Sequence, residues 1–503
     1  MAILIRNGLV LTEAHAEPTT ADILVEADRI TRVESSLEPR PDTRIIDASN
    51  QLVMPGLVNA HTHTHNVPSK AALDGLPLEI WLQYRMARTL NLSPREIYVS
   101  AAVNAIEMVK TGTTCACEMA QVLPYPTDEA LDAVGQAYTD VGLRASIAAQ
   151  VADRSFLEGL PGIESLLPED ILTQLKSRPP FPREETLATI RRAVDRWHGA
   201  AEGRIRFGVG PSSVTNCSDE FLEGCAQLSR ERGVTVQTHL CETKAGARAA
   251  LLRYGKSAAA RLHELGLLGP RTILAHSIWV DDHDIDLIAE TRSSVAHNPI
   301  SNLKLGDGIA PVLKMRARGC NVALGTDGSA SSDNQNLFGP LRVAAILHRV
   351  VDPNYDRWLS GADVLDMATA NGARAAGFEG QTGGISPGKK ADLVLLDLRS
   401  IYYHPQNDLV CHVVHCEVGS SVTTVLVDGR VIVESGKVTT VDEAALLAEA
   451  DEIARRVSSI MEDPTGLARR IAPYVRQIWI AATSGAWQPN QYASEAYRDL
   501  TDP

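Results

Sequence analysis

Histidines stand where they could hold a metal ion at the end of a short apolar run, Leu57-Val58-Asn59-Ala60-His61-Thr62-His63. Residues i and i+2 of a strand point to the same face, so His61 and His63 can lie side by side. Two adjacent imidazoles suit Zn²⁺ or Fe²⁺. A single His-x-His pair is weak evidence, so the prediction depends on what the other apolar runs carry.

Four later apolar runs also end in residues that can bind a metal. Their terminal residues are His239, His276, His297 and Asp327. Imidazoles gathered at one place need polar partners, which a metal ion supplies, so packing alone does not account for the whole set. For His297 an alternative role stays open, which is to anchor the loop that follows it.

Eight short apolar runs alternate with helix-forming stretches through the middle of the chain, at residues 57–60, 111–114, 143–147, 205–209, 234–238, 272–275, 294–296 and 322–325. Strands that alternate with helices indicate a parallel sheet, and eight repeats favour an α/β fold with a (β/α)8 TIM-type barrel. Barrel enzymes carry their chemistry at the carboxyl ends of the strands. The histidines and Asp327 fall at those ends.

Strand-like segments flank the barrel on both sides in sequence, at residues 1–12, 22–26, 44–48, 390–397 and 423–433, the last divided by an Asp-Gly turn. We therefore predict a small β-sandwich domain built from both chain ends, residues 1–55 and 385–440. The barrel then covers residues 56–384, and residues 441–503 form a helical tail. Its Trp479 and Trp487 suit a tail that covers the barrel or a neighbouring subunit.

Composition excludes several classes of protein. The 503 residues carry a formal net charge of -14, which argues against a nucleic-acid partner. The sequence shows no secretory signal and no apolar stretch long enough for a membrane span. Its eight cysteines form no Cys-x-x-Cys motif, so we expect reduced thiols and a cytoplasmic protein.

In order and spacing, the motifs resemble those of the amidohydrolase superfamily, in the branch that holds triazine hydrolases, guanine-type deaminases and S-adenosylhomocysteine deaminases. The matching stretches are Met54–His63, Thr111–Thr114, His239–Thr243, His297–Leu305, Gly325–Gly328 and Gly388–Val394. The resemblance extends over about residues 1–440.

The resemblance implies a role for each residue of the site. It makes His61, His63, His239 and Asp327 the four ligands of one divalent metal ion, zinc or alternatively iron. His276 matches a histidine that hydrogen-bonds the attacking water or the substrate. Glu242 matches the glutamate that passes protons to the leaving group. The bridging lysine of two-metal relatives has no counterpart in Gly208–Ser212, so a single ion is expected.

Substrate contacts lie in the loops, where this chain departs from its relatives. The candidates are His65, Trp81, Trp279, Asn302 and Ser329. Ser212 stands where adenosine-type deaminases tend to carry a histidine after Gly-Pro, which weakens the expectation of a nucleoside substrate.

The leading hypothesis is hydrolytic deamination of an aminated N-heterocycle of purine, pterin, pyrimidine or triazine type. The resemblance also implies a homodimer or larger homo-oligomer, with a small-molecule substrate and no membrane partner. Loss of chloride or an amine from a triazine, or cleavage of an amide or urea, is the alternative within the same chemistry. A non-catalytic binding protein on a barrel scaffold is the remote one. Glu242 favours nitrogen as the leaving group, because nitrogen needs a proton to depart.

Overall fold

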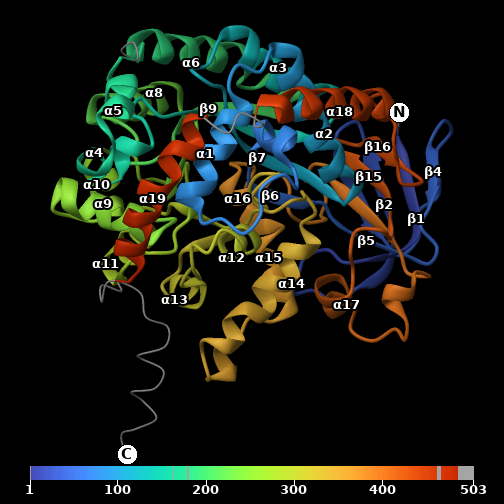
Figure 1. The fold of residues 1–503 in the computed structure, drawn as a ribbon. Coiled ribbons are helices and arrows are strands. Elements are labelled where there is room, and N and C mark those ends of the chain that lie inside the picture. Colours follow the sequence, from blue (N-terminus) through green and yellow to red (C-terminus); the bar gives the residue numbers. More distant parts are fainter. Residues whose placement is uncertain (1, 161, 178–180, 461–465, 485–503) are drawn as a thin grey trace, which may run out of the picture.

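Eight parallel strands form a nearly closed barrel at the centre of the computed structural model, which describes residues 2–160, 162–177, 181–460 and 466–484 (Figure 1). Each predicted run is one of these strands, in chain order, so the TIM-type barrel is confirmed. The strands are β6 (Leu57–Thr62), β7 (Thr113–Gln121), β8 (Arg144–Val151), β9 (Ile205–Pro211), β10 (Val236–Leu240), β11 (Thr272–His276), β12 (Ser294–His297) and β13 (Asn321–Leu324).

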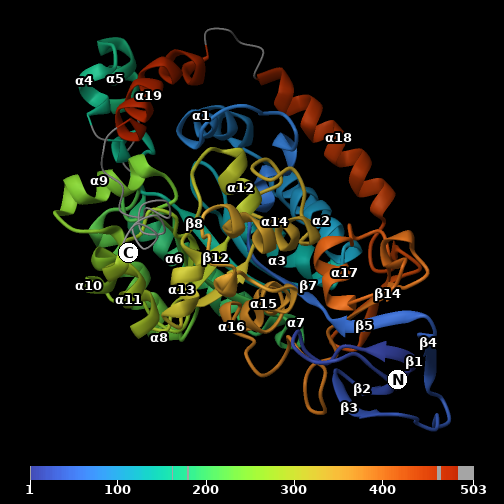
Figure 2. The ribbon, with the colours of Figure 1, turned by 90° about the horizontal axis from the view of Figure 1, so that it is seen from below.

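Helices follow most of the strands and cover the outside of the barrel (Figure 2). They are α1 (Leu78–Thr89), α2 (Pro94–Lys110), α3 (Asp128–Val141), α4 (Ile163–Leu166), α5 (Glu169–Lys176), α6 (Arg183–Trp197), α7 (Ala200–Gly203), α8 (Asp219–Arg232), α9 (Lys244–Tyr254), α10 (Ala258–Glu264), α11 (Asp282–Glu290), α12 (Pro299–Lys304), α13 (Val312–Ala317), α14 (Phe338–Leu347), α15 (Gly361–Met367) and α16 (Ala370–Ala375). Short 3-10 turns supplement them: η1 (Thr64–Ser69), η2 (Leu157–Gly159), η3 (His348–Val350), η4 (Tyr355–Arg357) and η5 (Ile401–Tyr403).

The sequence sets helix ends by local capping. Helix α2, for example, begins after Ser93, whose hydroxyl accepts from the backbone of Glu96 while the Glu96 carboxylate accepts from the backbone of Ser93. This reciprocal pair, with Pro94 at the first helical position, satisfies backbone donors that the first helical turn leaves free. Side-chain caps of this kind also begin α3, α8, α9 and α11.

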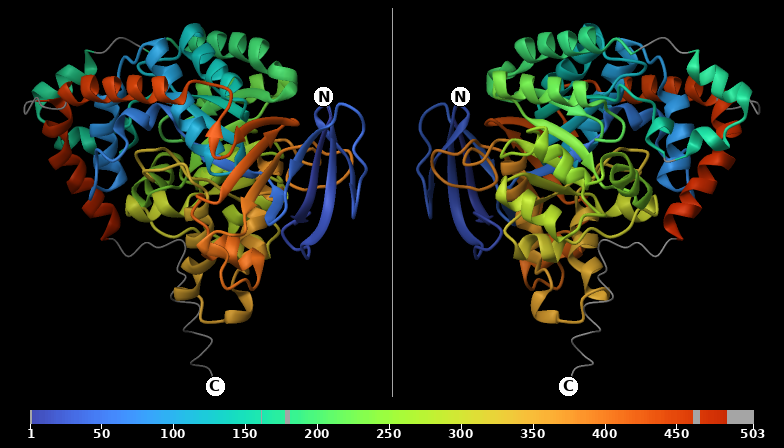
Figure 3. Two further views of the ribbon diagram at one scale, coloured as in Figure 1. Left: turned by 90° about the vertical axis from the view of Figure 1, so that its right-hand side faces the viewer. Right: turned by 90° about the vertical axis from the view of Figure 1, so that its left-hand side faces the viewer.

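Both chain ends build one mixed sheet of nine strands beside the barrel, which confirms a separate β unit made from both ends of the chain (Figure 3). Its strands are β1 (Ile3–Val10), β2 (Thr19–Glu26), β3 (Arg29–Glu34), β4 (Arg44–Asp47), β5 (Gln51–Pro55), β14 (Leu393–Asp397), β15 (Val422–Val427), β16 (Arg430–Glu434) and β17 (Lys437–Val438). Strand β5 joins the two ends: it pairs parallel with β1 and antiparallel with β14, with Val53 opposite Leu395.

Three further helices complete the described chain. Helix α17 (Leu409–His415) lies in the β-rich part of the chain, and α18 (Glu443–Ile460) packs along α2. Helix α19 (Leu467–Thr483) packs against α1 and α9, with Trp479 half-buried; Trp487 lies outside the described residues. None of the described helices is long and apolar enough to cross a membrane.

A buried ion network ties the barrel to the mixed sheet. The Arg144 guanidinium, at the amino end of β8, donates two hydrogen bonds to Asp392, at 2.7 and 2.9 Å, and one to Asp428 at 2.5 Å. All three side chains are at most 3% exposed. A buried carboxylate that loses its cationic partner is left uncompensated, which is costly in a low-dielectric interior.

Replacing Arg144 with methionine should therefore lower the free energy of unfolding by about 3–5 kcal/mol, measured from urea denaturation. Arg399→Met is the matched control, because Arg399 and its partner Asp397 lie at the surface and such pairs contribute about 1 kcal/mol or less. Equal stability of the Arg144 variant and the wild type would contradict a structural role for the network.

Candidate metal centre

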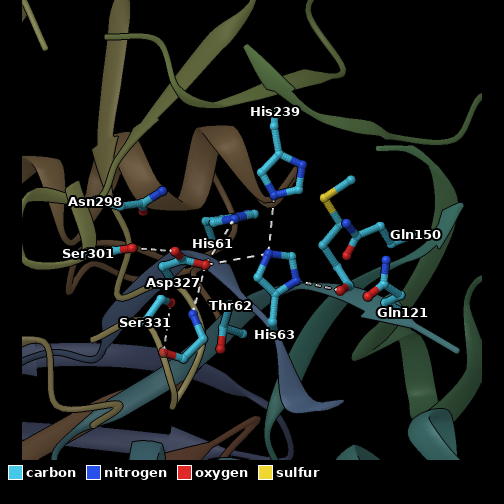
Figure 4. A network of polar contacts seen from close by, with 12 residues as sticks. His61, Thr62, His63, Gln121, Gln150, His239, Asn298, Ser301, Asp327 and Ser331 are labelled. Atoms are coloured by element: carbon cyan, nitrogen blue, oxygen red, sulfur yellow. Dashed lines mark hydrogen bonds and ion pairs between the residues drawn. The ribbon is translucent and has the colours of Figure 1, made fainter. Parts of the chain in front are cut away.

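The four residues expected to bind a metal meet at the carboxyl end of the barrel (Figure 4). His61 and His63 lie at the end of β6, His239 on β10, and Asp327 three residues after β13. The Nε2 atom of His63 lies 3.2 Å from that of His239 and 3.4 Å from Oδ1 of Asp327, and Nε2 of His61 lies 3.6 Å from the same oxygen.

The outer nitrogens of two imidazoles fix how the rings face the centre. Nδ1 of His63 donates to the Met119 carbonyl at 2.8 Å, and Nδ1 of His239 donates to the Ser212 carbonyl at 2.7 Å. Each Nε2 therefore carries a lone pair, and the two lone pairs face each other. A cation between them removes the repulsion, and a backbone carbonyl behind each ring is the usual support for a metal-binding histidine.

Burial keeps these imidazoles neutral. It lowers the pKa of His63 to about 3 and lowers those of His61 and His239 as well. Neutral imidazole is the form that binds a metal. The His61 Nε2 atom is buried and has no hydrogen-bond partner among the described residues. The donor set therefore fits one divalent ion.

Asp327 is held as a carboxylate by two hydrogen bonds. Oδ2 accepts from the Ser301 hydroxyl at 2.5 Å and Oδ1 from the Gly328 backbone at 2.8 Å. Burial would raise the pKa of Asp327, but the adjacent histidines and Ser301 outweigh it and hold the pKa well below its usual range. One carboxylate and three neutral imidazoles make a ligand set that suits a divalent cation such as zinc.

The backbone is strained where the site is built. Cys241 after β10, His276 at the end of β11 and Asp327 after β13 all have positive φ angles, 45°, 69° and 63°. Residues other than glycine rarely adopt this conformation, and where they do they cluster at functional sites. Here the left-handed turns occur at the ends of β10, β11 and β13, around the barrel mouth.

Hydrogen bonds across the barrel seam set the spacing of His61 and Asp327. The Asn59 amide donates to the Thr326 hydroxyl at 2.7 Å, and its Oδ1 accepts from the Thr326 backbone at 3.0 Å. The Asp327 backbone donates to the His61 carbonyl at 2.9 Å. These bonds link the ends of β6 and β13. Asn59 and Thr326 therefore have a structural role beside the expected ligands.

His276 and Glu242 lie next to the four expected ligands. Nε2 of His276 is 3.4 Å from Oε1 of Glu242, and Nδ1 of His276 donates to Asn302 at 2.8 Å. Burial raises the pKa of Glu242 to about 8. The negative charges of Asp327 and Glu79 add to this rise, and His239 opposes it. Glu242 can therefore carry a proton at neutral pH, as a general acid must.

A cavity of about 970 Å³ opens over the centre and is lined by His63, His239, Glu242 and Asp327. Of the expected substrate contacts, His65 and Trp81 are part of its wall. The other three take part in bonds outside that wall: Asn302 orients His276, Trp279 donates to the Asp307 carbonyl, and Ser329 donates to Asn104.

Three buried carboxylates near the site, Glu79, Glu118 and Asp307, were missed by sequence reasoning. Glu79 is 2% exposed, and burial raises its pKa. Glu118 is fully buried beneath the loop after His63: Oε1 accepts from the backbone and hydroxyl of Thr64, and Oε2 accepts from Tyr138, each at 3.0 Å. Glu79 could have been recognised from the sequence, because it is an acidic residue inside the otherwise apolar segment Leu78–Leu82.

Glu118 should make stability depend on pH. Burial raises its pKa from 4.5 to about 7, so the folded protein binds this proton more tightly than the unfolded chain does. The stabilisation is complete below pH 4.5 and is lost as the pH rises through about 7. Glu118→Gln keeps an oxygen for Thr64 but cannot titrate. Its free energy of unfolding should therefore rise, relative to that of the wild type, by about 1–3 kcal/mol between pH 5 and pH 8, measured by urea denaturation. The exposed Glu129→Gln serves as control; a stability difference that does not change with pH would contradict the assignment.

The comparisons with known proteins agree with this geometry. The sequence matches the Amidohydrolase family over residues 52–432. It is 36% identical over 467 residues to a 5'-deoxyadenosine deaminase of Methanosarcina mazei, covering 91% of this chain and 99% of that protein. It is 33% identical to a 5-methylthioadenosine/S-adenosylhomocysteine deaminase of Caldanaerobacter subterraneus, covering 91% and 99%.

Among solved structures, the fold is similar to that of an atrazine chlorohydrolase from Arthrobacter aurescens complexed with zinc. The TM-score is 0.81 and the identity 27%, over 90% of this chain and 100% of that one.

Proposed function

The chain belongs to the amidohydrolase family and is a hydrolytic deaminase of an aminated N-heterocycle, and we propose that its substrate is an adenosine with a modified 5′ position. The observation that carries the proposal is the similarity, over nearly the whole chain, to deaminases named for such adenosines. The cavity beside Glu242 has room for a nucleoside.

We propose that His61, His63, His239 and Asp327 hold one zinc ion. Their facing Nε2 lone pairs and the low pKa of Asp327 support this ligand set. When bound, such an ion supplies a water molecule whose pKa is lowered to roughly 7. The solved chlorohydrolase of similar fold is named as a zinc complex.

The chain's own residues move the protons. Asp327 accepts a proton from the attacking water as the carbon–oxygen bond forms. Glu242 delivers its proton to the departing amino group, so the carbon–nitrogen bond breaks and ammonia leaves, and the proton held by Asp327 then passes to Glu242 and restores both residues. His276, fixed by Asn302, presents Nε2 towards the same position, 3.4 Å from the Glu242 carboxyl. General acid–base residues of this kind contribute about 10²–10⁴-fold to rate.

Glu79 supports a ribose-containing substrate. Both of its oxygens are buried, which raises its pKa, and Thr243 is the side-chain hydrogen-bond donor that lowers it among the described residues. It lies close enough to Glu242 and Asp307 to raise the pKa of both. Buried acceptors without donors are costly, and two adjacent hydroxyls supply donors to both oxygens of one carboxylate. We infer that Glu79 binds the ribose hydroxyls.

Ammonia release from the purified zinc enzyme tests the proposal. The substrates are 5'-deoxyadenosine, 5-methylthioadenosine and S-adenosylhomocysteine, with guanine, a pterin and an aminotriazine as comparisons. We expect ammonia from at least one adenosine, loss of turnover on chelation and its recovery with zinc. Ammonia from the comparison compounds alone would refute the adenosine assignment, and an active metal-free protein would refute the metal site.

We also propose that the protein is a cytoplasmic homo-oligomer. Six of its eight cysteines are buried as free thiols, which suits a reducing compartment. The segment from α14 to η4 projects from the body of the molecule (Figure 1) and exposes Ile346, Val350 and Tyr355, at 44%, 83% and 72%. Exposed apolar side chains grouped in this way favour burial against another subunit. Sedimentation at micromolar concentration showing only monomer would contradict the oligomer.

A further inference from the structure

A buried cation in the cavity wall has no role in the deamination described above. Arg85, on α1, is 4% exposed and lines the cavity. It forms no ion pair with a carboxylate in the described part of the chain, and its Nε has no hydrogen-bond partner there. Buried charges are normally paired, because desolvation without compensation is costly.

The neighbours of Arg85 orient it without neutralising it. Nη1 donates to the Gln121 amide oxygen at 2.6 Å and more weakly to the Thr89 hydroxyl at 3.4 Å. The guanidinium carbon lies 5.7 Å from the centre of the Trp81 ring. Burial lowers the pKa of Arg85 to about 10, so it is still a cation at neutral pH.

His65 presents a second polar atom without a partner on the same wall. It is 5% exposed, its ring centre is 5.2 Å from that of His63, and Nδ1 is buried without a hydrogen bond among the described residues. Arg85 and His65 both line the cavity, and each has a buried nitrogen without a hydrogen-bond partner among the described residues.

Two groups of opposite charge lie near the metal centre, and the cavity wall also holds other charged side chains. The mutually interacting carboxyls of Glu79, Glu242 and Asp307 form one group, and burial and repulsion raise the pKa of each. Arg85 and His65, near the ends of β7 and β6, form the other. A ligand that fits both groups offers hydrogen-bond donors to the carboxyls and a negative group to Arg85.

We propose that Arg85 and His65 form an anion-binding subsite that takes a carboxylate on the 5′ substituent of the nucleoside. The inference rests on the proposed adenosine substrate and names the group that distinguishes one adenosine from another. A guanidinium fork matches carboxylate and phosphate oxygens alike. The guanidinium carries one positive charge, which balances the single charge of a carboxylate better than the nearly double charge of a phosphate.

Two adenosines that differ at the 5′ side chain test the subsite. S-adenosylhomocysteine and 5-methylthioadenosine share the nucleoside and the thioether, but only the former carries a carboxylate. In the zinc enzyme, Arg85→Met should lower kcat/KM for S-adenosylhomocysteine about 10–100-fold, as expected for a lost charged hydrogen bond. It should change kcat/KM for 5-methylthioadenosine by less than about 3-fold, and Arg85→Lys should recover part of the loss.

Arg88→Met is the matched control, because Arg88 is a buried arginine one turn further along α1 that lies outside the cavity wall. It should affect both substrates equally. An Arg85→Met effect that is equal for the two substrates, or absent for both, would overturn the subsite.

Calorimetric binding in the Glu242→Gln background separates the subsite from the proposed function. There S-adenosylhomocysteine should bind more tightly than 5-methylthioadenosine only while Arg85 is present. Wild-type enzyme that releases ammonia from neither adenosine refutes the adenosine assignment. Equal affinities of the two adenosines, before and after the Arg85 change, refute the subsite.

Discussion

Replacing Asp327 with alanine should lower kcat by about 10³-fold or more, because one change removes a ligand and a proton acceptor. Both roles follow from its position: Oδ1 lies 3.4 Å from Nε2 of His63 and 3.6 Å from Nε2 of His61. Among the described residues, Asp327 is the carboxylate that faces the Nε2 atoms of both His61 and His63. Turnover and zinc content of the purified variant are the measurements.

Two further variants interpret the Asp327 result. Asp327→Asn keeps an oxygen for Ser301 but cannot accept the proton, so zinc content should fall less than turnover. Asp333→Ala changes an acidic residue of the same loop that pairs with Lys304 and does not face the centre, and it should keep its activity. If Asp327→Ala kept kcat within about 10-fold of the wild type, Asp327 would lose its place in the proton transfer.

The barrel was predictable because its strands are short apolar runs with polar residues at one end. Val58, buried in β6, and Leu274, buried in β11, are typical of strands covered on both faces. Strand β5 is not among the predicted strands, and only Gly56 separates it from β6 in the structure. A Cβ atom on Gly56 would lie 2.1 Å from Thr114, which explains why so tight a junction needs glycine.

The ligand cluster was predictable for a related reason. Parallel strands bring their carboxyl ends to one edge, so His61, His239 and Asp327 meet although they are far apart in sequence. The pattern could not show which partner orients each ring, because the Met119 and Ser212 carbonyls are backbone groups that any residue supplies. The roles of the individual residues stay predictions until the variants are measured.

Arg85 and Glu118 could not be found from sequence because their significance comes from what surrounds them. An arginine on a helix is ordinarily solvated, and only the fold shows that α1 turns Arg85 into the cavity wall. Ser212 shows the converse limit. Its side chain weakened the expectation of a nucleoside, whereas the relatives with adenosine-type names favour one. Its carbonyl is the group that orients His239.

Replacing Glu242 with glutamine should lower kcat for deamination by about 10²–10⁴-fold while the zinc content stays unchanged. Glutamine keeps the size of the side chain and a hydrogen-bonding group near His276, but it cannot carry the proton. Burial and neighbouring negative charges raise the pKa of Glu242 to about 8, which keeps that proton available at neutral pH. The unchanged zinc content would distinguish this variant from Asp327→Ala.

The leaving group determines how much Glu242 contributes. An amino group must be protonated to depart as ammonia, whereas chloride departs as an anion. In the glutamine variant, an analogue with chloride in place of the amino group should therefore lose less of its rate than the natural amine. Proton delivery to the leaving nitrogen predicts this difference in single-turnover rates, and an equal loss for both compounds would place the function of Glu242 at the ring nitrogen or the attacking water instead.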